Sequence, residues 1–499
     1  MERIRMRLSA GIHIEEFSTH DGGGHTKHHA VSAISLMSCP SSRLHDSNTH
    51  GYPVSFLTNQ IDLINTLYQP DHPPTYGIRF VSRPHSSSFS GGRIEVCIFC
   101  KATAATAARA RSAAEDQTEQ LLLQLCSSLQ DYVWNVVGDE AAFRALWEPF
   151  DWSTAYVTEV RRREELVALD TIPETRGLGF AGSKTISAAR SGHPVYYIHP
   201  FLPHPGQIER LLRIMLLHRA PLAFTASITP ALFSEQERQA MLSQISRCEG
   251  YQPDPAPNVQ RIQEQRAHMV SQGILAQMLR LQNAPFFTLA SIASPQPISR
   301  PLAEAAGVAV SASVGENPGS VYPEPAFIHM GGYNLVNPTG PEETSTARDN
   351  LRTLSQNMWG SSLASRGLER IRYLMDGNEA ANAFRFPEDL GNGLPGIKVH
   401  TQRMRPIPAE LVCEAPCTTA SKGILIGTNT DLGLSQDVVL SDENRLTHTY
   451  VVGQTGTGKT TLLKTMILSD MRAGRGCALI DPHGDLFKEL LELIPPERI

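Results

Sequence analysis

The chain has 499 residues, of which 41 % are hydrophobic and 19 % are charged, and this balance excludes a largely disordered or fibrous protein. Its formal net charge of −6, from 44 basic and 50 acidic residues, argues against a polybasic chain that coats nucleic acid but leaves room for a local basic channel. The length, without an evident internal repeat, indicates about three domains.

Residues 1–50 are rich in Ser, Thr and His and contain Asp21-Gly22-Gly23-Gly24, which predicts a poorly ordered leader. No stretch of the chain reaches the roughly 18 uninterrupted apolar residues that a membrane-spanning helix needs. Residues 1–10 are rich in Arg but lack the apolar centre of a secretory signal. The eight cysteines are scattered, as reduced thiols usually are. We therefore expect a cytoplasmic protein without a membrane span.

Strand and helix patterns alternate over residues 51–252, which we expect to form an α+β N-terminal domain. The expected strands cover residues 77–82, 93–99, 156–160 and 194–198. The expected helices cover residues 104–130, 207–217 and 234–248. In the first of these helices, Leu121, Leu125 and Leu129 recur at helical spacing.

A Pro-rich linker at residues 254–257 leads to a second mixed domain, expected over residues 258–410. Its expected elements are a strand at 286–292 and helices at 259–282, 300–307, 347–358 and 367–375. Residues 313–346 are rich in Gly, Pro and Asn and predict a loop-rich excursion. Residues 51–252 show no catalytic signature, and the sequence does not indicate the role of residues 51–425.

Residues 453–460 read GQTGTGKT, the G-x-x-x-x-G-K-[ST] pattern of a phosphate-binding loop. Because lysine is scarce in this chain, the amino-acid composition predicts only roughly 0.006 chance matches to this loop pattern per chain. The glycines allow successive backbone N–H groups to converge on a phosphate at a helix N-terminus. A Gly-rich turn that happens to contain a lysine is the alternative.

The loop predicts a site for ATP and Mg²⁺. We expect Lys459, the principal catalytic candidate, to reach the β- and γ-phosphates and the Thr460 hydroxyl to bind Mg²⁺. The predicted nucleotide-binding residues are Gly453, Gln454, Thr455, Gly456, Thr457, Gly458, Lys459, Thr460 and Thr461.

The flanking residues predict a βαβ unit around this loop. Residues 449–452 are a β-branched and aromatic run typical of a buried strand. Residues 460–472 carry an apolar helical stripe, and Gly474 and Gly476 would end that helix. Residues 477–480 form a second apolar run, so strand, loop, helix and strand make one right-handed unit.

Residues 447–485, THTYVVGQTGTGKTTLLKTMILSDMRAGRGCALIDPHGD, closely resemble the first part of the motor domain of the HerA–FtsK superfamily of hexameric pumping ATPases. The shared features are His448, the phosphate loop and the Asp-Pro-x-Gly-Asp sequence at 481–485. Within the superfamily the segment looks most like HerA-type ATPases and the coupling proteins of type IV secretion and conjugation. Residues 423–440 resemble the strand-rich lead-in, and residues 76–150 and 368–387 more weakly resemble the N-terminal domain of secretion ATPases.

The resemblance implies an α/β fold in which N-terminal α+β domains precede the start of a RecA-like P-loop NTPase domain at residues 420–499, represented by its first βαβ unit only. It implies an ATPase that moves DNA through a hexameric ring, with a nuclease or a secretion channel as a partner. Asp481 and Asp485 are further catalytic candidates. They would orient the attacking water, hold Mg²⁺ through water, or only shape their loop.

The family's motor domain continues with a Walker B strand, an acidic catalytic residue and an arginine finger, whereas this chain stops at Ile499. Two parallel strands cannot bury both faces, so we expect a fragment or a truncated product that lacks the full catalytic site. The first hypothesis is a DNA translocase or helicase. The alternatives are a type IV secretion or conjugation ATPase and a nucleotide-binding or interaction module without turnover. The lack of N-terminal membrane helices favours a HerA-like protein over a coupling protein.

Two cysteine pairs provide a weak zinc signal. Cys97 and Cys100 lie within an expected strand, and Cys413 and Cys417 have a wider spacing than most zinc pairs. We therefore favour ordinary buried or loop thiols over a zinc site.

Overall fold

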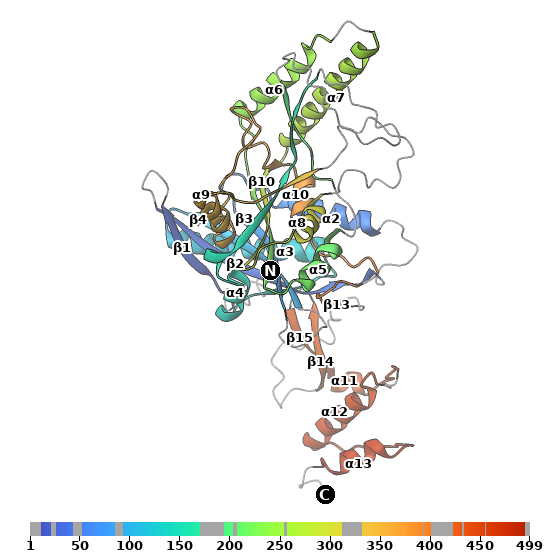
Figure 1. Ribbon diagram of the computed structural model, residues 1–499. Coiled ribbons are helices and arrows are strands. Elements are labelled where there is room, and N and C mark those ends of the chain that lie inside the picture. Colours follow the sequence, from blue (N-terminus) through green and yellow to red (C-terminus); the bar gives the residue numbers. More distant parts are fainter. Residues whose placement is uncertain are drawn as a thin grey trace. The chain divides into compact units, whose positions relative to one another are not determined.

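The computed structural model describes residues 11–20, 26–42, 52–84, 93–169, 194–202, 207–253, 257–311, 332–391, 393–400, 423–431, 434–454 and 456–494. The chain divides into two compact units, Met1–Gln402 (unit 1) and Arg403–Ile499 (unit 2), which are considered one at a time (Figure 1). Together they are a mixed α and β structure with a large, mostly antiparallel sheet. Among the described residues, no helix combines the length and apolarity needed to cross a lipid bilayer.

Unit 1 is built on an 11-stranded sheet whose main path is β1-β2-β4-β3-β9-β10-β6-β11. The strands of its first half are β1 (Glu15–His20), β2 (Thr26–Pro40), β3 (Thr75–Arg83), β4 (Arg93–Ala104) and β5 (Val133–Val136). Those of its second half are β6 (Tyr156–Arg162), β9 (Leu222–Pro230), β10 (Phe286–Ser294) and β11 (Tyr333–Val336). The expected regions 51–252 and 258–410 thus share one sheet and one compact unit, so the expected division between them is not observed.

The two halves of the sheet repeat one topology. The first half runs β2, α2, β3, β4, α3, β5, and its strands lie in the order β5-β2-β4-β3. The second half runs β6, α5, β9, β10, α8, β11, with the order β11-β6-β10-β9. Each is the βαββαβ arrangement called ferredoxin-like, with the fourth, first, third and second strands side by side. The two second strands, β3 and β9, pair antiparallel at the junction.

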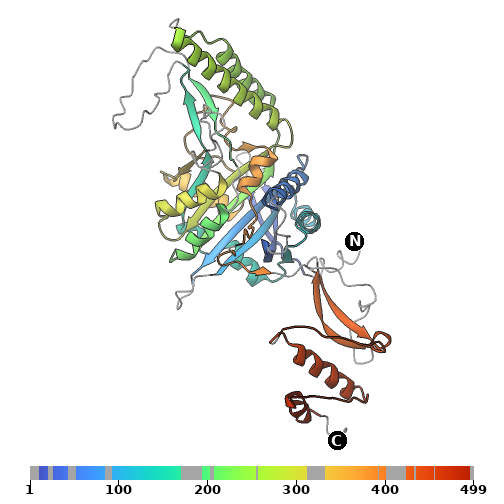
Figure 2. The same cartoon turned by 90° about the vertical axis from the view of Figure 1, so that its right-hand side faces the viewer.

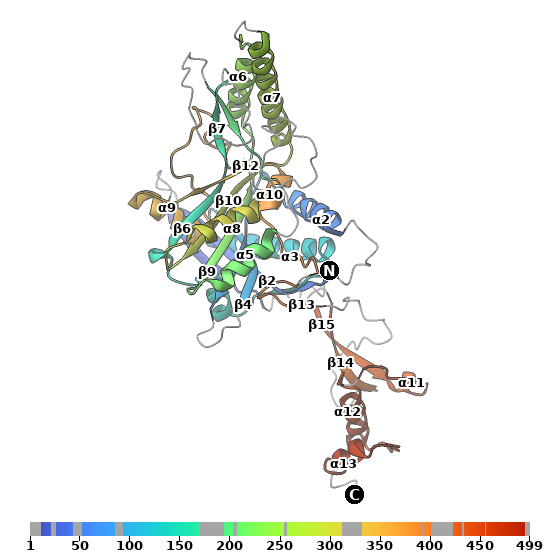
Figure 3. The same cartoon turned by 45° about the vertical axis from the view of Figure 1, so that its right-hand side comes forward.

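One face of the sheet carries a layer of helices (Figures 1 and 3). These are α2 (Tyr52–Thr66), α3 (Ala107–Ser128), α5 (Gln207–Leu217), α8 (Arg300–Val310) and α10 (Gly377–Ala383). Apolar side chains of all five helices and of both halves of the sheet form a single buried cluster, which includes Ile78, Phe80, Phe224 and Ile292. The other face packs against α4 (Glu140–Trp147) and α9 (Pro341–Arg352).

The prediction of a poorly ordered leader is wrong for residues 26–40. They form β2, which pairs with β1, β4 and β5. Its Ser and Ala side chains are small enough for both faces of the strand to be covered, and Ala30, Val31, Ser32 and Ile34 are at most 1 % exposed. A polar composition therefore concealed an interior strand.

Three further expectations in the C-terminal part of unit 1 differ from the structure. The expected helix at 367–375 is a series of turns that ends in β12 (Leu374–Met375), because Gly367 has φ +89° and β12 pairs with β10. Part of the expected loop-rich excursion is ordered into β11 and the start of α9. The helix expected at 347–358 is displaced, because α9 covers Pro341–Arg352 and residues 353–358 are not helical. The other expected strands and helices of this unit coincide with elements of the structure, although their ends differ by up to five residues.

Insertions in the second repeat form an arm with its own core (Figure 2). The arm consists of β7 (Glu164–Val167), β8 (Val195–Ile198), α6 (Glu235–Glu249) and α7 (Pro257–Leu281). Figure 3 shows β7 beside α6 and α7. Their apolar side chains, including Val195, Met241, Val270 and Ile274, form a buried cluster separate from that of the helix layer.

Unit 2 begins with an antiparallel hairpin and continues with helices. Its elements are β14 (Gly423–Asp431), β15 (Leu434–Ser441), α11 (Asp442–Arg445), α12 (Lys459–Arg472) and α13 (Asp485–Leu491). The helix after the phosphate loop agrees with the prediction, but residues 449–452 and 477–480, both described, are not strands. Tyr450 and Ile480 are at least 90 % exposed, so no sheet buries these apolar runs as a βαβ unit would require.

Candidate functional site

The phosphate loop has the backbone that its glycines predict. Gly456 and Gly458 have φ of +84° and +89°, a left-handed conformation that glycine adopts at little cost. No atom lies within 4 Å of a Cβ placed on either residue, so backbone conformation rather than crowding requires glycine there. Gly458 is also the N-cap of α12. Thr455, which the sequence places in the site, lies outside the described residues.

Lys459 closes the loop from the first position of α12. Its Nζ donates to the main-chain oxygens of Gly453 and Gln454, each at 2.6 Å. The Thr457 hydroxyl donates to the same Gln454 oxygen at 2.7 Å. A Cβ on Gly453 would lie 2.5 Å from Thr457 Oγ1, so a side chain at this position would displace the Thr457 hydroxyl. The loop is therefore organised around the lysine ammonium group.

The first turn of α12 provides donors for an anion. The first main-chain hydrogen bond of the helix joins Leu462 N–H to Gly458 O, at 2.9 Å. The N–H groups of Lys459, Thr460 and Thr461 precede it and so have no intrahelical acceptor. Thr460 and Thr461 are exposed at this end of the helix. N–H groups, an ammonium group and an adjacent hydroxyl are the donor set that fits a polyphosphate with Mg²⁺.

Asp481 folds its carboxylate onto the start of α13. It accepts hydrogen bonds from the N–H groups of His483 (3.1 Å) and Phe487 (3.2 Å). Desolvation raises the pKa of Asp481, but the main-chain N–H donors lower it by more than desolvation raises it. The pKa of Asp481 therefore lies below its ordinary value. Gly484, the N-cap with φ +77°, has no side chain to cap the helix, so Asp481 supplies the cap. This geometry supports the loop-shaping role among the three expected for Asp481. Asp485, the first residue of α13, is exposed.

A charged network at the other end of α12 was not predicted from the sequence. Arg445 donates from both Nη atoms to Asp470, at 2.8 and 2.5 Å. Arg475 Nη2 donates to Asp442 at 2.9 Å, and Arg475 Nη1 lies 3.4 Å from Asp470 Oδ1. Asp470 is only 8 % exposed. Spacing provides no signal for Arg445–Asp470 or Arg475–Asp442, because these partners are 25 and 33 residues apart and meet only in the folded unit.

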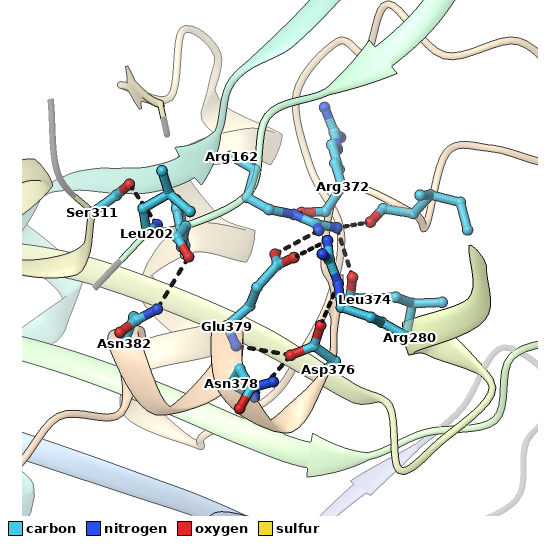
Figure 4. A network of polar contacts seen from close by, with 12 residues as sticks. Arg162, Leu202, Arg280, Ser311, Arg372, Leu374, Asp376, Asn378, Glu379 and Asn382 are labelled. Atoms are coloured by element: carbon cyan, nitrogen blue, oxygen red, sulfur yellow. Dashed lines mark hydrogen bonds and ion pairs between the residues drawn. The ribbon is translucent and has the colours of Figure 1, made fainter. Parts of the chain in front are cut away.

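A second charged network lies in unit 1, where β6, α7 and α10 meet (Figure 4). Glu379 accepts from Arg162 at 2.9 Å and from Arg280 at 3.2 Å, and Arg280 also pairs with Asp376 at 2.8 Å. Burial raises the pKa of Glu379, while Arg162 and Arg280 oppose that rise. The two arginines and two carboxylates satisfy one another. Arg162 lies on β6 of the sheet and Arg280 lies on α7 of the arm, and both bind Glu379. The network therefore joins the arm to the sheet, which is a structural role.

The cysteine pair in unit 1 does not form a metal site. Cys97 and Cys100 are separated by an odd number of positions on β4, and their side chains lie in the buried clusters on opposite faces of the sheet. Burial raises the pKa of each thiol to about 12. The described residues contain no group of three or more His, Cys, Asp or Glu side chains that could hold a metal ion. Cys413 and Cys417 lie outside the described residues.

Comparison with known proteins supports the nucleotide site. Residues 413–471 match the FtsK/SpoIIIE family, a range that contains the β14–β15 hairpin, the phosphate loop and nearly all of α12. For this segment the match supports the FtsK–HerA superfamily of P-loop ATPases, whose FtsK/SpoIIIE members are DNA-translocating ATPases. No curated protein matches the chain.

Proposed function

We propose that this chain is a nucleotide-binding subunit of an ATP-driven DNA translocase or helicase. The observation that carries the proposal is the loop at residues 453–461, in which two glycines at positive φ deliver Lys459 and three N–H groups without intrahelical acceptors to one helix end. The family match over residues 413–471 adds the class of motor.

The residues of the loop divide the work of holding ATP. The N–H groups at the start of α12 donate hydrogen bonds to the phosphate oxygens, because the helix dipole and the missing intrahelical acceptors both favour an anion there. Lys459 exchanges its two carbonyl acceptors for phosphate oxygens. The Thr460 hydroxyl holds Mg²⁺, which when bound neutralises charge on the transferred phosphoryl group.

The finer assignment is a HerA-like motor that assembles as a hexamer, moves DNA and works with a nuclease or a channel partner. A secretion or conjugation ATPase would use the same loop for protein or nucleoprotein export. The response of the ATPase activity to DNA distinguishes these two functions. A motor that binds the phosphate backbone has ATPase activity that DNA stimulates, and high salt weakens this stimulation steeply. ATPase activity that does not respond to DNA at low salt would favour the export motor.

The test of nucleotide binding compares two lysines of one helix. Lys459→Ala removes the loop ammonium, whereas Lys464→Ala removes an ammonium that pairs with Glu489 at 2.8 Å on the surface. We expect Lys459→Ala to weaken binding of Mg–ATPγS by about tenfold or more, since it deletes charge-assisted hydrogen bonds. We expect Lys464→Ala to leave the affinity unchanged.

Isothermal titration calorimetry on the full chain measures both affinities, and thermal unfolding confirms that each variant is folded. Equal affinities of the unsubstituted chain and Lys459→Ala would contradict the proposed site. A chain that binds no nucleotide would leave the interaction module as the better description.

A further inference from the structure

The segment that leads into the phosphate loop is held mainly at its two ends. After a turn at Leu446, residues 448–454 form neither a helix nor a paired strand, and Leu446, Tyr450 and Val452 are between 76 and 90 % exposed. At the loop end, Lys459 binds the carbonyl oxygens of Gly453 and Gln454. At the other end, the segment follows directly from Arg445, the last residue of α11.

Arg445 ties that second end to α12. Its guanidinium makes a two-pronged contact with Asp470, and this geometry fixes direction as well as distance. Arg475 reinforces the contact, because its side chain binds Asp442 and its N–H donates to the main-chain oxygen of Asp470 at 2.9 Å. Arg445 holds the pKa of Asp470 below its ordinary value, so the carboxylate remains charged at neutral pH.

The contact lies far from the nucleotide site. By the α-helical rise, Asp470 is about 17 Å along α12 from Lys459, so Arg445 cannot reach a phosphate held at the helix N-terminus. The segment 446–454 therefore spans one side of α12 between two cationic contacts. A rigid helix couples these contacts, and a shift at Asp470 alters the path by which the chain enters the loop.

We propose that Arg445 and Asp470, supported by Arg475 and Asp442, form an anchor that positions the phosphate loop for nucleotide. This rests on the proposed function, because it assigns positioning residues to the same site. The anchor residues touch no phosphate. They determine how residues 446–454 enter the loop, and thereby how the loop N–H groups and Lys459 are arranged.

The test is a double-mutant cycle on the full chain with Mg–ATPγS as the probe. Arg445→Ala and Asp470→Asn each weaken binding by about tenfold, and the double variant is no weaker than the poorer single variant because both changes remove one contact. Arg445→Lys recovers part of the affinity, since an ammonium group cannot form the two-pronged contact. Arg472→Ala removes an exposed cation from the last turn of α12 and leaves the affinity unchanged.

Affinities are measured well below each variant's own unfolding midpoint, so that only folded molecules are compared. Variants that lower the midpoint but keep the affinity of the unsubstituted chain would reduce the anchor to a structural contact and overturn the inference, while leaving the proposed function in place. Loss of affinity that adds fully in the double variant would also overturn it. A chain that binds no nucleotide before substitution would overturn the proposed function and the positioning role together.

Discussion

Lys101 is a buried lysine within the sheet of unit 1. It lies on β4, is 6 % exposed, and donates from Nζ to the main-chain oxygens of Thr353 (2.9 Å) and Leu354 (2.6 Å). Leu354 has φ +47°, and a Cβ on Gly77 would lie 2.8 Å from its Cδ2 atom. Lys101 and Gly77 thus both stabilise the unusual backbone conformation of Leu354. Lys101 binds the carbonyl groups of residues 353 and 354, and Gly77 leaves room for the Leu354 side chain.

We predict that Lys101 makes the free energy of unfolding increase with pH in the alkaline range. Burial lowers its pKa to about 7 from the ordinary 10.5. Between these two values the unfolded chain binds more protons than the folded chain, so the free energy of unfolding rises as pH increases from about 7 towards 10.5. Denaturant titrations of the full chain at several pH values measure this slope, and Lys101→Met flattens it.

Lys398→Met, which replaces an exposed lysine of unit 1, is the matched control and retains the slope of the unsubstituted chain. A slope that Lys101→Met leaves intact would show that other groups cause it. The comparison depends on the change in slope, because the substitution also leaves two carbonyl groups without their donor and lowers stability at every pH.

For individual residues, the sequence predicted those roles that depend on residues adjacent in the chain. The loop glycines and Lys459 form a local pattern, and the structure gives Gly456 and Gly458 the positive φ that the pattern requires. Arg445 and Lys101 were not predicted, because their partners are distant in the sequence and contact them only after folding. Nothing in the spacing of an arginine or a lysine indicates a bidentate partner or a pair of carbonyl groups.

The arm illustrates how elements divide the stability of unit 1. Its apolar cluster includes Ile274, which is 3 % exposed, and is separate from the cluster beneath the helix layer, which includes the fully buried Phe80. Charged contacts of Arg162 and Arg280 with Glu379 join the arm to the sheet. The arm cluster also packs against Phe287 of β10, but its separation from the main cluster favours partly independent opening of the arm.

Substitution of one residue in each core tests this division. We predict that Ile274→Ala costs about 2–5 kcal/mol locally and speeds amide hydrogen exchange in α6, α7, β7 and β8 more than in the central strands. Phe80→Ala, at a cost of about 3–5 kcal/mol, speeds exchange throughout the sheet. Leu279→Ala, at a half-exposed position of the same α7 helix, changes neither the exchange in the arm nor the exchange in the sheet. Uniform acceleration by Ile274→Ala would show that arm and sheet open as one unit.

Elements were predictable where local periodicity and tertiary packing agree. The helix expected at 207–217 matches α5, and the helix expected at 460–472 matches α12 to within one residue. Residues 367–375 show helical spacing, but pairing of Leu374–Met375 with β10 overrides it. Residues 449–452 have strand composition, but a strand needs a neighbour, and composition does not provide one.

The duplication in unit 1 is a property of the whole fold that the sequence did not reveal. The two βαββαβ repeats preserve the order of elements and their pairing, not their residues or loop lengths. Only the second repeat has the arm insertions, so equivalent elements are unequally spaced along the chain. Strands that are buried on both faces also lack the alternating pattern by which repeated hairpins are recognised.

The attachment of unit 1 to the chain that follows it defines a path for mechanical load. The last strand of unit 1, β13 (Val399–His400), pairs with the end of β2 through Cys39 N–H to Lys398 O (2.9 Å) and Ser41 N–H to His400 O (2.8 Å). Among the described residues of unit 1, these are the most C-terminal main-chain hydrogen bonds, so they are the first to bear tension applied to its C-terminal end. The 15-residue β2 then spreads the force over β1, β4 and β5, which all pair with it. A load on the C-terminal end of unit 1 is thus borne by a strand that pairs with several others.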